Sequence, residues 1–513
     1  MRRSIYAVLI IIVFVLGVHF STPLYAHHLK QGATDSMPVT TSSAEARALY
    51  QKGMQDYENL YLERCNDDWR AAVKADPNLA VAWAWIAFNG SDPKEVAAAR
   101  EKAKALAPKL PPGERLMVAW IAKVQEGDFI GGISAMNDML EMYPRDKHLL
   151  YLAGNWLLLE NGDDQALRIM EKALVLDRNF PAALNDLAYL RARNREFAKA
   201  FAAMDRYVAL LPNEPNPQDS YGELLRMAGN FEGSLHHYRA ALKIDPDFVT
   251  SQVGLGDTYA LMGNQEQARN EYDKAIRNAH NEADRLDYSM QKGMTWVRDG
   301  NFSEADKLFQ EIAQIAHAKD QNLREAQAYR HLGEYQTDDK VALNYLQDAE
   351  GSLELGTISK SDKGEELSRI LRNRTVRAAH AGYADLAEKS LKQLEAMATG
   401  SRNRVIQSSY NGAAGTLLMD QANVDQANLN RASVDQAGLD IKNDDSKKYL
   451  EAISYLEEDQ DNPFTMQLLV QAYYHTNQSE KLAEAESRLR GTNVPTMEQA
   501  LVVPAARLRR PEM

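Results

Sequence analysis

Histidines, carboxylates and glycine-rich turns are the residues of this chain that could do chemistry, and none of them forms a familiar catalytic pattern. The eleven histidines are scattered, and the adjacent pair His236 and His237 would point in different directions on a helix. Gly254 and Gly256 begin a dinucleotide-like turn, but the third glycine and the preceding strand are missing. Gly-x-Ser-x-Gly, His-Glu-x-x-His, P-loop and EF-hand patterns are also missing. We therefore predict a protein that is not an enzyme, with no catalytic residue, metal site or cofactor.

One metal-dependent alternative remains open near the amino terminus. If Ala26 were the last residue of a removed signal, the chain would begin with His27 and His28. An N-terminal histidine can chelate copper through its own amine. No other histidine motif supports this, so a metal-dependent enzyme is the last of the functions considered.

The first 26 residues have the three regions of a secretory signal peptide. Arg2 and Arg3 precede an apolar run from Ile5 to Val18, and a small residue follows at Ala26. The run is shorter than the ~20 residues of a typical membrane span. We expect a cleaved signal and a periplasmic or secreted protein, with no stable membrane insertion afterwards. An uncleaved anchor is the alternative, because tilting can rescue a short span.

Composition narrows the possible partners. The 513 residues are 45% hydrophobic and carry a formal net charge of −13. Nucleic acid requires basic stripes, so this balance argues against it. The single cysteine, Cys65, cannot close an internal disulfide, and we interpret it as a packing residue.

A small residue recurs along the chain at a nearly constant interval. The recurring positions are Cys65, Ala99, Gly132, Ala166, Ala200, Ser234, Ala268 and Ala305. Four residues after most of them stands a bulky side chain, and these are Trp69, Met136, Met170, Met204, Tyr238, Tyr272 and Phe309. The interval is 33 or 34 residues until a last step of 37. Such a period predicts repeated pairs of short helices.

A turn signal lies in the same register. Glycine followed by Asn or Asp occurs at Gly127-Asp128, Gly162-Asp163, Gly229-Asn230, Gly263-Asn264 and Gly300-Asn301. In one copy, Leu255-Gly256-x-x-Tyr259 lies in the first helix, and Ala268 stands four residues before Tyr272. This resembles the tetratricopeptide repeat (TPR), whose period is 34 residues. Gly256 and Ala268 would let the paired helices approach closely, with Tyr272 beside the contact.

The resemblance implies an all-α fold: a right-handed α-α superhelix, or TPR solenoid, of antiparallel helix pairs, in an exported bacterial protein. The expected parts are a signal peptide (1–26), a flexible lead-in (27–43), a TPR solenoid (44–350), a linker (351–364), C-terminal degenerate helical repeats (365–490) and a tail (491–513). We expect the tail to be extended.

Residues 419–441 carry a different, five-residue period that resembles the pentapeptide repeat. Four copies would make only about one coil of a β-helix, too few to bury a core. We therefore interpret this stretch as a local sequence expansion in a long loop or a helix extension.

The resemblance places the first helix of each pair on the concave surface. Counting 100° per residue from Gly256 assigns residues to that surface, one set per repeat. The candidate ligand groove comprises Tyr151, Asn155, Asn185, Tyr189, Asp219, Glu223, Arg226 and Asp257. Tyr151 and Tyr189 could instead pack between neighbouring first helices. Arg226 could pair with a nearby carboxylate or with an acid of the partner.

These observations favour a non-enzymatic protein–protein interaction scaffold of the bacterial cell envelope. Its concave groove would bind a protein or peptide segment with basic and apolar residues, because the groove combines acids with tyrosines. A glycan-binding TPR protein of the envelope is the alternative, with the same tyrosines and acids contacting sugar.

Overall fold

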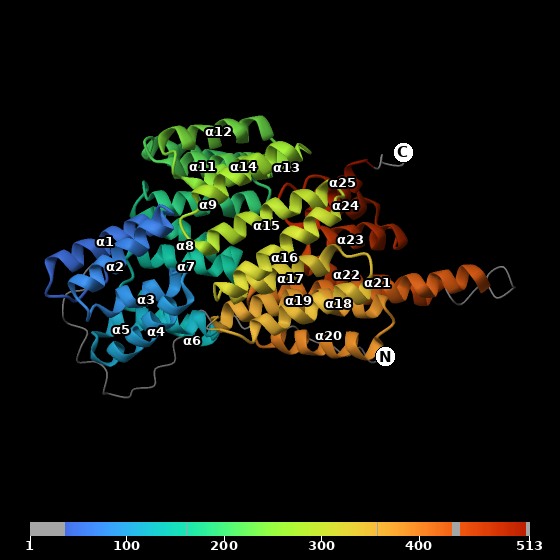
Figure 1. Cartoon of the computed structure of the whole chain (residues 1–513), viewed down its shortest axis with the longest axis horizontal. Helices are drawn as coiled ribbons and strands as arrows, with labels where there is room; N and C mark the ends of the chain where they lie inside the picture. Colours follow the sequence, from blue (N-terminus) through green and yellow to red (C-terminus); the bar gives the residue numbers. More distant parts are fainter. Residues whose placement is uncertain (1–35, 161, 357, 433–441, 509–513) are drawn as a thin grey trace, which may run out of the picture.

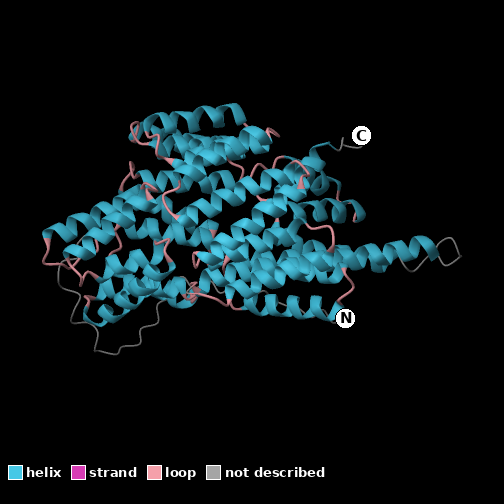
Figure 2. Cartoon of the chain, in the orientation of Figure 1, coloured by secondary structure: helices cyan, strands magenta, loops and turns pink. Residues whose placement is uncertain are grey.

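A computed structural model describes residues 36–160, 162–356, 358–432 and 442–508 of the chain. These residues form 25 α-helices and no strand (Figures 1 and 2), which confirms the all-α prediction. Nine helix pairs follow one another: α1 (Ala44–Glu58) and α2 (Leu62–Ala75), α3 (Ala80–Asn89) and α4 (Pro93–Leu106), α5 (Pro112–Gln125) and α6 (Phe129–Met142), α7 (Lys147–Leu159) and α8 (Asp163–Leu176), α9 (Pro181–Arg193) and α10 (Phe197–Leu210), α11 (Pro215–Met227) and α12 (Phe231–Ile244), α13 (Val249–Leu261) and α14 (Gln265–Asn278), α15 (Glu282–Arg298) and α16 (Phe302–Ala318), α17 (Asn322–Tyr335) and α18 (Asp339–Leu353).

The carboxyl-terminal part continues the helical array. Its helices are α19 (Lys360–His380), α20 (Ala384–Thr399), α21 (Arg404–Ala432), α22 (Lys442–Leu456), α23 (Pro463–His475), α24 (Ser479–Arg490) and α25 (Met497–Leu508). Two short 3₁₀ turns are η1 (Ala107–Lys109) and η3 (Glu457–Asp459). Helix α19 packs against both α17 and α18, so it continues the helical array after α18.

The predicted small and bulky residues form the contact inside each helix pair. Every alanine of the small-residue set is fully buried, and so are Cys65 and Ser234. In several pairs the opposite side of the contact is a glycine of the first helix. A Cβ atom placed on Gly256 would stand 2.7 Å from the Tyr272 ring, and one on Gly293 would stand 2.8 Å from the Phe309 ring. The helices of a pair therefore approach as closely as the missing side chains allow.

The turns between paired helices have the geometry that their residues favour. Gly229, Gly263 and Gly300 adopt φ values of +83°, +89° and +69°, a region that glycine enters without steric cost. The residue after each glycine caps the next helix. The Asn264 side chain, for example, accepts a hydrogen bond from the backbone N–H of Gln267 at 3.2 Å.

The array curves until segments distant in sequence meet. Helices of the carboxyl-terminal third lie alongside α15 to α17 in Figure 1. Tyr61 donates a hydrogen bond to Glu214, and Lys94 pairs with Asp320 at 2.8 Å. Arg404 pairs with Asp163, 241 residues away in the chain. Hydrogen bonds and ion pairs between distant segments therefore hold the curved array together.

Two expectations for the carboxyl-terminal part can be compared with the structure. The expectation of an extended tail is wrong for residues 497–508, because they form α25, whose Val503 is fully buried against α23 and α24. A helix places the apolar side chains of this stretch on one face, where burial stabilises them more than it would in an extended chain. Residues 419–432 of the five-residue period belong to α21, as a helix extension, and residues 433–441 lie outside the described residues.

We predict that Ala268→Leu lowers the free energy of unfolding by about 1–3 kcal/mol, because Ala268 has no exposed surface and its added carbons would push α13 and α14 apart. Urea unfolding of the purified protein measures the effect. Asn270→Leu is the matched control, since Asn270 lies on the exposed side of the same helix. Equal unfolding midpoints for the two variants would contradict the assigned register.

Candidate functional site

The predicted groove residues lie on four neighbouring first helices, α7, α9, α11 and α13. Four of them are buried: Tyr151, Asn185, Arg226 and Asp257, with exposed fractions of 2%, 4%, 3% and 8%. The other four are half-buried, and these are Asn155, Tyr189, Asp219 and Glu223. A partner can therefore reach only the second set without local opening of the helices.

Hydrogen bonds join these side chains from one first helix to the next. Asn155 Nδ2 donates to Asp186 Oδ2 at 2.9 Å, and the Tyr189 hydroxyl donates to Glu223 at 2.8 Å. Farther along, Ser251 donates to Asp219 at 2.6 Å. We call this series of bonds the first-helix ladder. It holds α7, α9, α11 and α13 in line.

Arg226 is the central cation of the ladder. Its guanidinium pairs with Asp257 at 2.6 Å and with Glu223 at 2.8 Å. The sequence left open whether Arg226 pairs with a nearby carboxylate or with an acid of the partner. In the structure it pairs with nearby carboxylates. Tyr272 also donates to Asp257 at 2.7 Å, so both oxygens of that carboxylate are used.

Tyr151 has the packing role that the sequence left as an alternative, since its ring meets that of Phe180 edge-on at 5.8 Å. Asp186 and Ser251 are ladder residues that the sequence reasoning missed. Their signal was available, because ladder partners are separated by 31 to 34 residues, slightly less than or equal to one repeat. A search for residues exactly one repeat apart misses these contacts, because several of them join residues only 31 or 32 positions apart.

Burial disfavours ionisation of the ladder carboxyls. It raises the pKa of Asp186 to about 6 and the pKa of Asp219 to about 7, although each accepts a hydrogen bond that opposes the shift. Burial also raises the pKa of Asp257, while Arg226 acts in the opposite direction. A cation brought beside Asp219 would favour the ionised form of this carboxyl and so lower its pKa.

A cleft of about 310 Å³ opens beside Tyr189. Its first wall consists of α9, α11 and the start of α10, with Arg193, Phe197 and Met227. Residues 491–496 form the opposite wall, where Asn493 Nδ2 donates to the Met227 carbonyl at 3.3 Å. The reachable part of the ladder is thus a cleft between the first helices and the carboxyl-terminal segment, and one side of it is basic.

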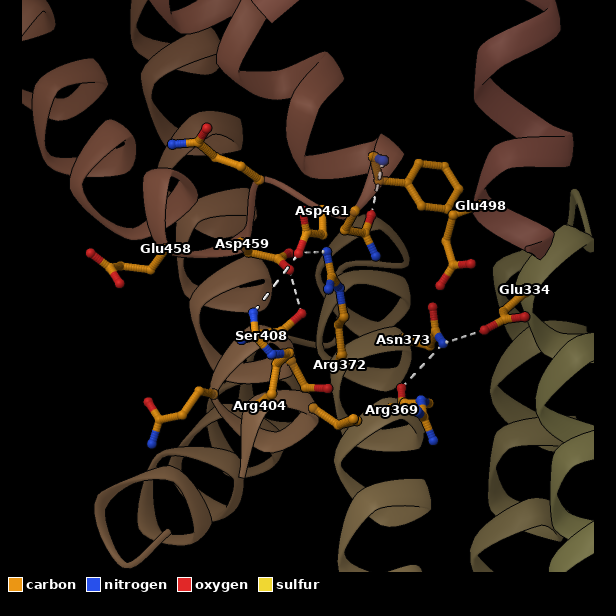
Figure 3. A pocket seen from close by; sticks show the side chains of 16 residues that line it. Glu334, Arg369, Arg372, Asn373, Arg404, Ser408, Glu458, Asp459, Asp461 and Glu498 are labelled. Carbon is orange, nitrogen blue, oxygen red and sulfur yellow. Dashed lines mark hydrogen bonds and ion pairs between the residues drawn. The ribbon is translucent and has the colours of Figure 1, made fainter. Parts of the chain in front are cut away.

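A second, polar cavity of about 240 Å³ lies where α17, α19, α21 and α25 meet (Figure 3). Arg372 extends into the middle and pairs with Asp459 at 2.9 Å. Asn373 donates to Glu334 at 3.1 Å on the other side. Burial raises the pKa of Asp459, and the Arg372 charge lowers it. These paired charges fasten helices together, which accounts for them without a ligand.

In the part of the chain that the structure describes, no group of three or more His, Cys, Asp or Glu side chains could hold a metal ion. His237 bonds to Gln218 at 2.7 Å and stacks on Tyr221. Cys65 is buried and its thiol contacts the Leu62 carbonyl. His27 and His28 lie outside the described residues. No described helix has both the length and the apolar character to cross a membrane.

Comparison with known families identifies the repeat. The family model described as TPR repeat matches residues 222–263, which run from α11 through α13. The chain therefore carries tetratricopeptide repeats, and its helix pairs form a TPR solenoid. No curated protein matches the sequence.

Several solved structures resemble the chain. A tetratricopeptide repeat protein from Parabacteroides merdae is 13% identical over 60% of this chain and 99% of its own, with a TM-score of 0.35. Yeast Tom70 is 14% identical over 85% of this chain and 96% of its own, with a TM-score of 0.43. A thermophilic TPR protein of Thermus thermophilus is 20% identical over 36% of this chain and 98% of its own, with a TM-score of 0.31.

We predict that Asp219→Asn makes the stability of the protein less dependent on pH. Because burial raises the folded pKa of Asp219 from its usual 3.8 to about 7, ionisation opposes folding. The protonated form of Asp219 contributes stability that is fully present below about pH 4 and is lost as the pH rises to about 7. Between the unfolded and folded pKa values, the loss is roughly 1.4 kcal/mol for each pH unit. The variant should therefore be more stable than the wild type at pH 8.

Urea unfolding at pH values from about 4 to about 8 measures this effect. Asp247→Asn is the matched control, because Asp247 is exposed and lies in a loop of the next repeat. If both variants follow the wild-type pH profile, the Asp219 carboxyl is solvated and ionises normally.

Proposed function

We propose that this protein is a non-enzymatic scaffold of the bacterial cell envelope that binds a segment of a partner protein on its concave face. The TPR fold, which is the fold of a protein–protein interaction scaffold, supports the proposal. Fold alone names no partner, so the proposal depends on the accessible residues of the groove.

The observation that carries the proposal is the cleft beside Tyr189. There the half-buried Tyr189, whose hydroxyl is bonded to Glu223, lines a space of about 310 Å³ that no side chain of the described residues fills. A tyrosine offers a rigid apolar face and a hydroxyl at little entropic cost, which suits binding to another protein. On the adjoining helix α11, Asp219 and Glu223 favour basic residues in the partner segment, while the arginines of the cleft wall favour an acidic residue beside them.

Export is the second part of the proposal. The charged start, the apolar run and the small residue at Ala26 support cleavage near that residue and a periplasmic or secreted location. Partners would then be other proteins of the envelope.

Replacement of Tyr189 and Glu223 by alanine together should weaken partner binding by about 2 kcal/mol or more, because the change removes a central aromatic anchor and its hydrogen-bond partner. Because the double change removes both partners of the Tyr189–Glu223 hydrogen bond, neither is left without a partner. Arg226 still pairs with Asp257. The partner is first isolated from envelope extract with the mature protein, and its affinity is then measured by calorimetry.

The matched control replaces Tyr221 and Asp205 by alanine. That pair is also a tyrosine bonded to a carboxylate, at 3.0 Å, but it joins α11 to the second helix α10. Unfolding curves verify that each variant is folded. Unchanged affinity in the Tyr189 variant would place the binding surface elsewhere on the solenoid, and a purified glycan as the captured ligand would favour the glycan-binding alternative.

Expression of the full chain in a bacterium with an envelope should yield a soluble periplasmic product that begins at or near His27. The reason is that the apolar run is too short to span a membrane comfortably. Fractionation followed by N-terminal sequencing measures both properties. Recovery of the intact chain in washed membranes would favour the uncleaved anchor.

A further inference from the structure

Residues 36–43 cross the first repeats without regular secondary structure. Their side chains alternate in exposure: Met37, Val39 and Thr41 face the helices, while the residues between them face outward. Met37 and Val39 pack against the core of the first repeats. Part of the expected lead-in is therefore seated on the solenoid in the manner of a bound peptide.

Two buried carboxylates hold this segment by its backbone. Asp146 Oδ2 accepts the Met37 N–H at 2.7 Å, and Glu114 Oε1 accepts the Thr40 N–H at 3.0 Å. The exposed fractions of Asp146 and Glu114 are 4% and 1%. Contacts to backbone N–H groups do not depend on side-chain identity, so another extended segment could make them equally well.

Glu114 is the stronger indication of a binding site. It lies in the first turn of α5, and its hydrogen bond comes from the lead-in and from no helix. Its second oxygen, Oε2, is buried and accepts no hydrogen bond from the residues that the structure describes. Burying an unsatisfied carboxylate oxygen is costly, and the helices alone leave the whole group unsatisfied. The carboxylate is thus directed at whatever occupies the groove.

The lead-in does not fill the groove that it crosses. A cleft of about 520 Å³ remains between it, α1, α7 and the start of α9. The apolar lining includes Met37, Val39, Met54, Leu149, Leu152 and Phe180. At the edge of the cleft, His148 bonds to the buried Glu58. The space is large enough to accept additional apolar side chains.

We propose that the groove of α1, α5 and α7 is a second protein-binding site, which takes an extended polypeptide with apolar residues at alternating positions and which residues 36–41 occupy as an exchangeable intramolecular ligand. A partner segment would replace the lead-in, donate its own N–H groups to Asp146 and Glu114, and place apolar side chains in the cleft. This site is separate from the cleft beside Tyr189, and its test does not depend on that proposal.

Competition with the tethered lead-in sets the size of the expected effect. The segment is joined directly to α1 through Ser43, which caps that helix. A short tether gives an effective concentration on the order of 1 mM. A free segment with an intrinsic Kd of roughly 100 μM would then bind about ten-fold more weakly to the wild type than to a protein whose groove is vacant.

The test uses the full-length protein and a fluorescent peptide with the chain's own sequence from Asp35 to Ser43. In one variant Met37→Asp and Val39→Asp detach the lead-in, and a milder variant carries alanine at both positions. Neither change touches a helix. A third protein adds Glu114→Met to the first variant and removes the acceptor while keeping the shape of the side chain. A peptide with aspartate in place of Met37 and Val39 is the matched control.

Fluorescence anisotropy should show that the peptide binds the detached variant about ten-fold more tightly than the wild type, and that Glu114→Met reverses most of this gain. The alanine variant should fall between the two. If the peptide binds every protein no better than the aspartate peptide does, the lead-in is a fixed part of the fold and the proposal is wrong. Equal binding to the wild type and to the detached variant would also overturn it, because the peptide would then occupy another surface.

The two proposed binding sites can fail separately. Replacement of Tyr189 and Glu223 by alanine should leave binding of the lead-in peptide unchanged. A natural partner that uses the groove of α1, α5 and α7 should displace the peptide from the detached variant, whereas a partner that uses only the cleft beside Tyr189 should not.

Discussion

The structure depends on a close approach, in several helix pairs, between a glycine of the first helix and a bulky residue of the second helix. Gly154, Gly256 and Gly293 stand where any side chain would collide with Met170, Tyr272 and Phe309, at distances of 2.7 to 2.8 Å from an added Cβ atom. The contact fixes the separation of the two helices. Because the same contact recurs along the chain, each pair repeats nearly the same geometry, and neighbouring pairs stack into a superhelix.

Stacking brings the first helices side by side. The polar side chains that lie between them must therefore be hydrogen-bonded or paired with a charge. The first-helix ladder meets this requirement with Asn155 and Asp186, Tyr189 and Glu223, and Arg226 and Asp257. Burial of such groups costs free energy unless each finds a partner. The ladder therefore serves the solenoid first, and only its half-buried members remain available to a ligand.

Closure of the superhelix limits the accessible surface further. The pair of Arg404 with Asp163 and the bond of Asn493 to Met227 join the carboxyl-terminal part to the middle repeats. Residues 36–41 cover part of the first repeats. Two of the clefts that stay open have one wall contributed by a segment distant in sequence. The two proposed binding sites are thus composites of a repeat face and a returning segment.

The sequence by itself determined the helix pairs, their register and their turns. Cys65, Ala268 and Tyr272 occupy the buried positions that the period predicts, and Gly263 and Asn264 form the predicted turn. These features are local, since they follow from steric contact and helix capping within a few tens of residues. Tertiary structure decided the pairing of Arg226, the burial of Tyr151 and Asn185, the seating of the lead-in and the helical tail. Those outcomes depend on the sum of many small rotations between repeats, which brings together residues as far apart as Met227 and Asn493.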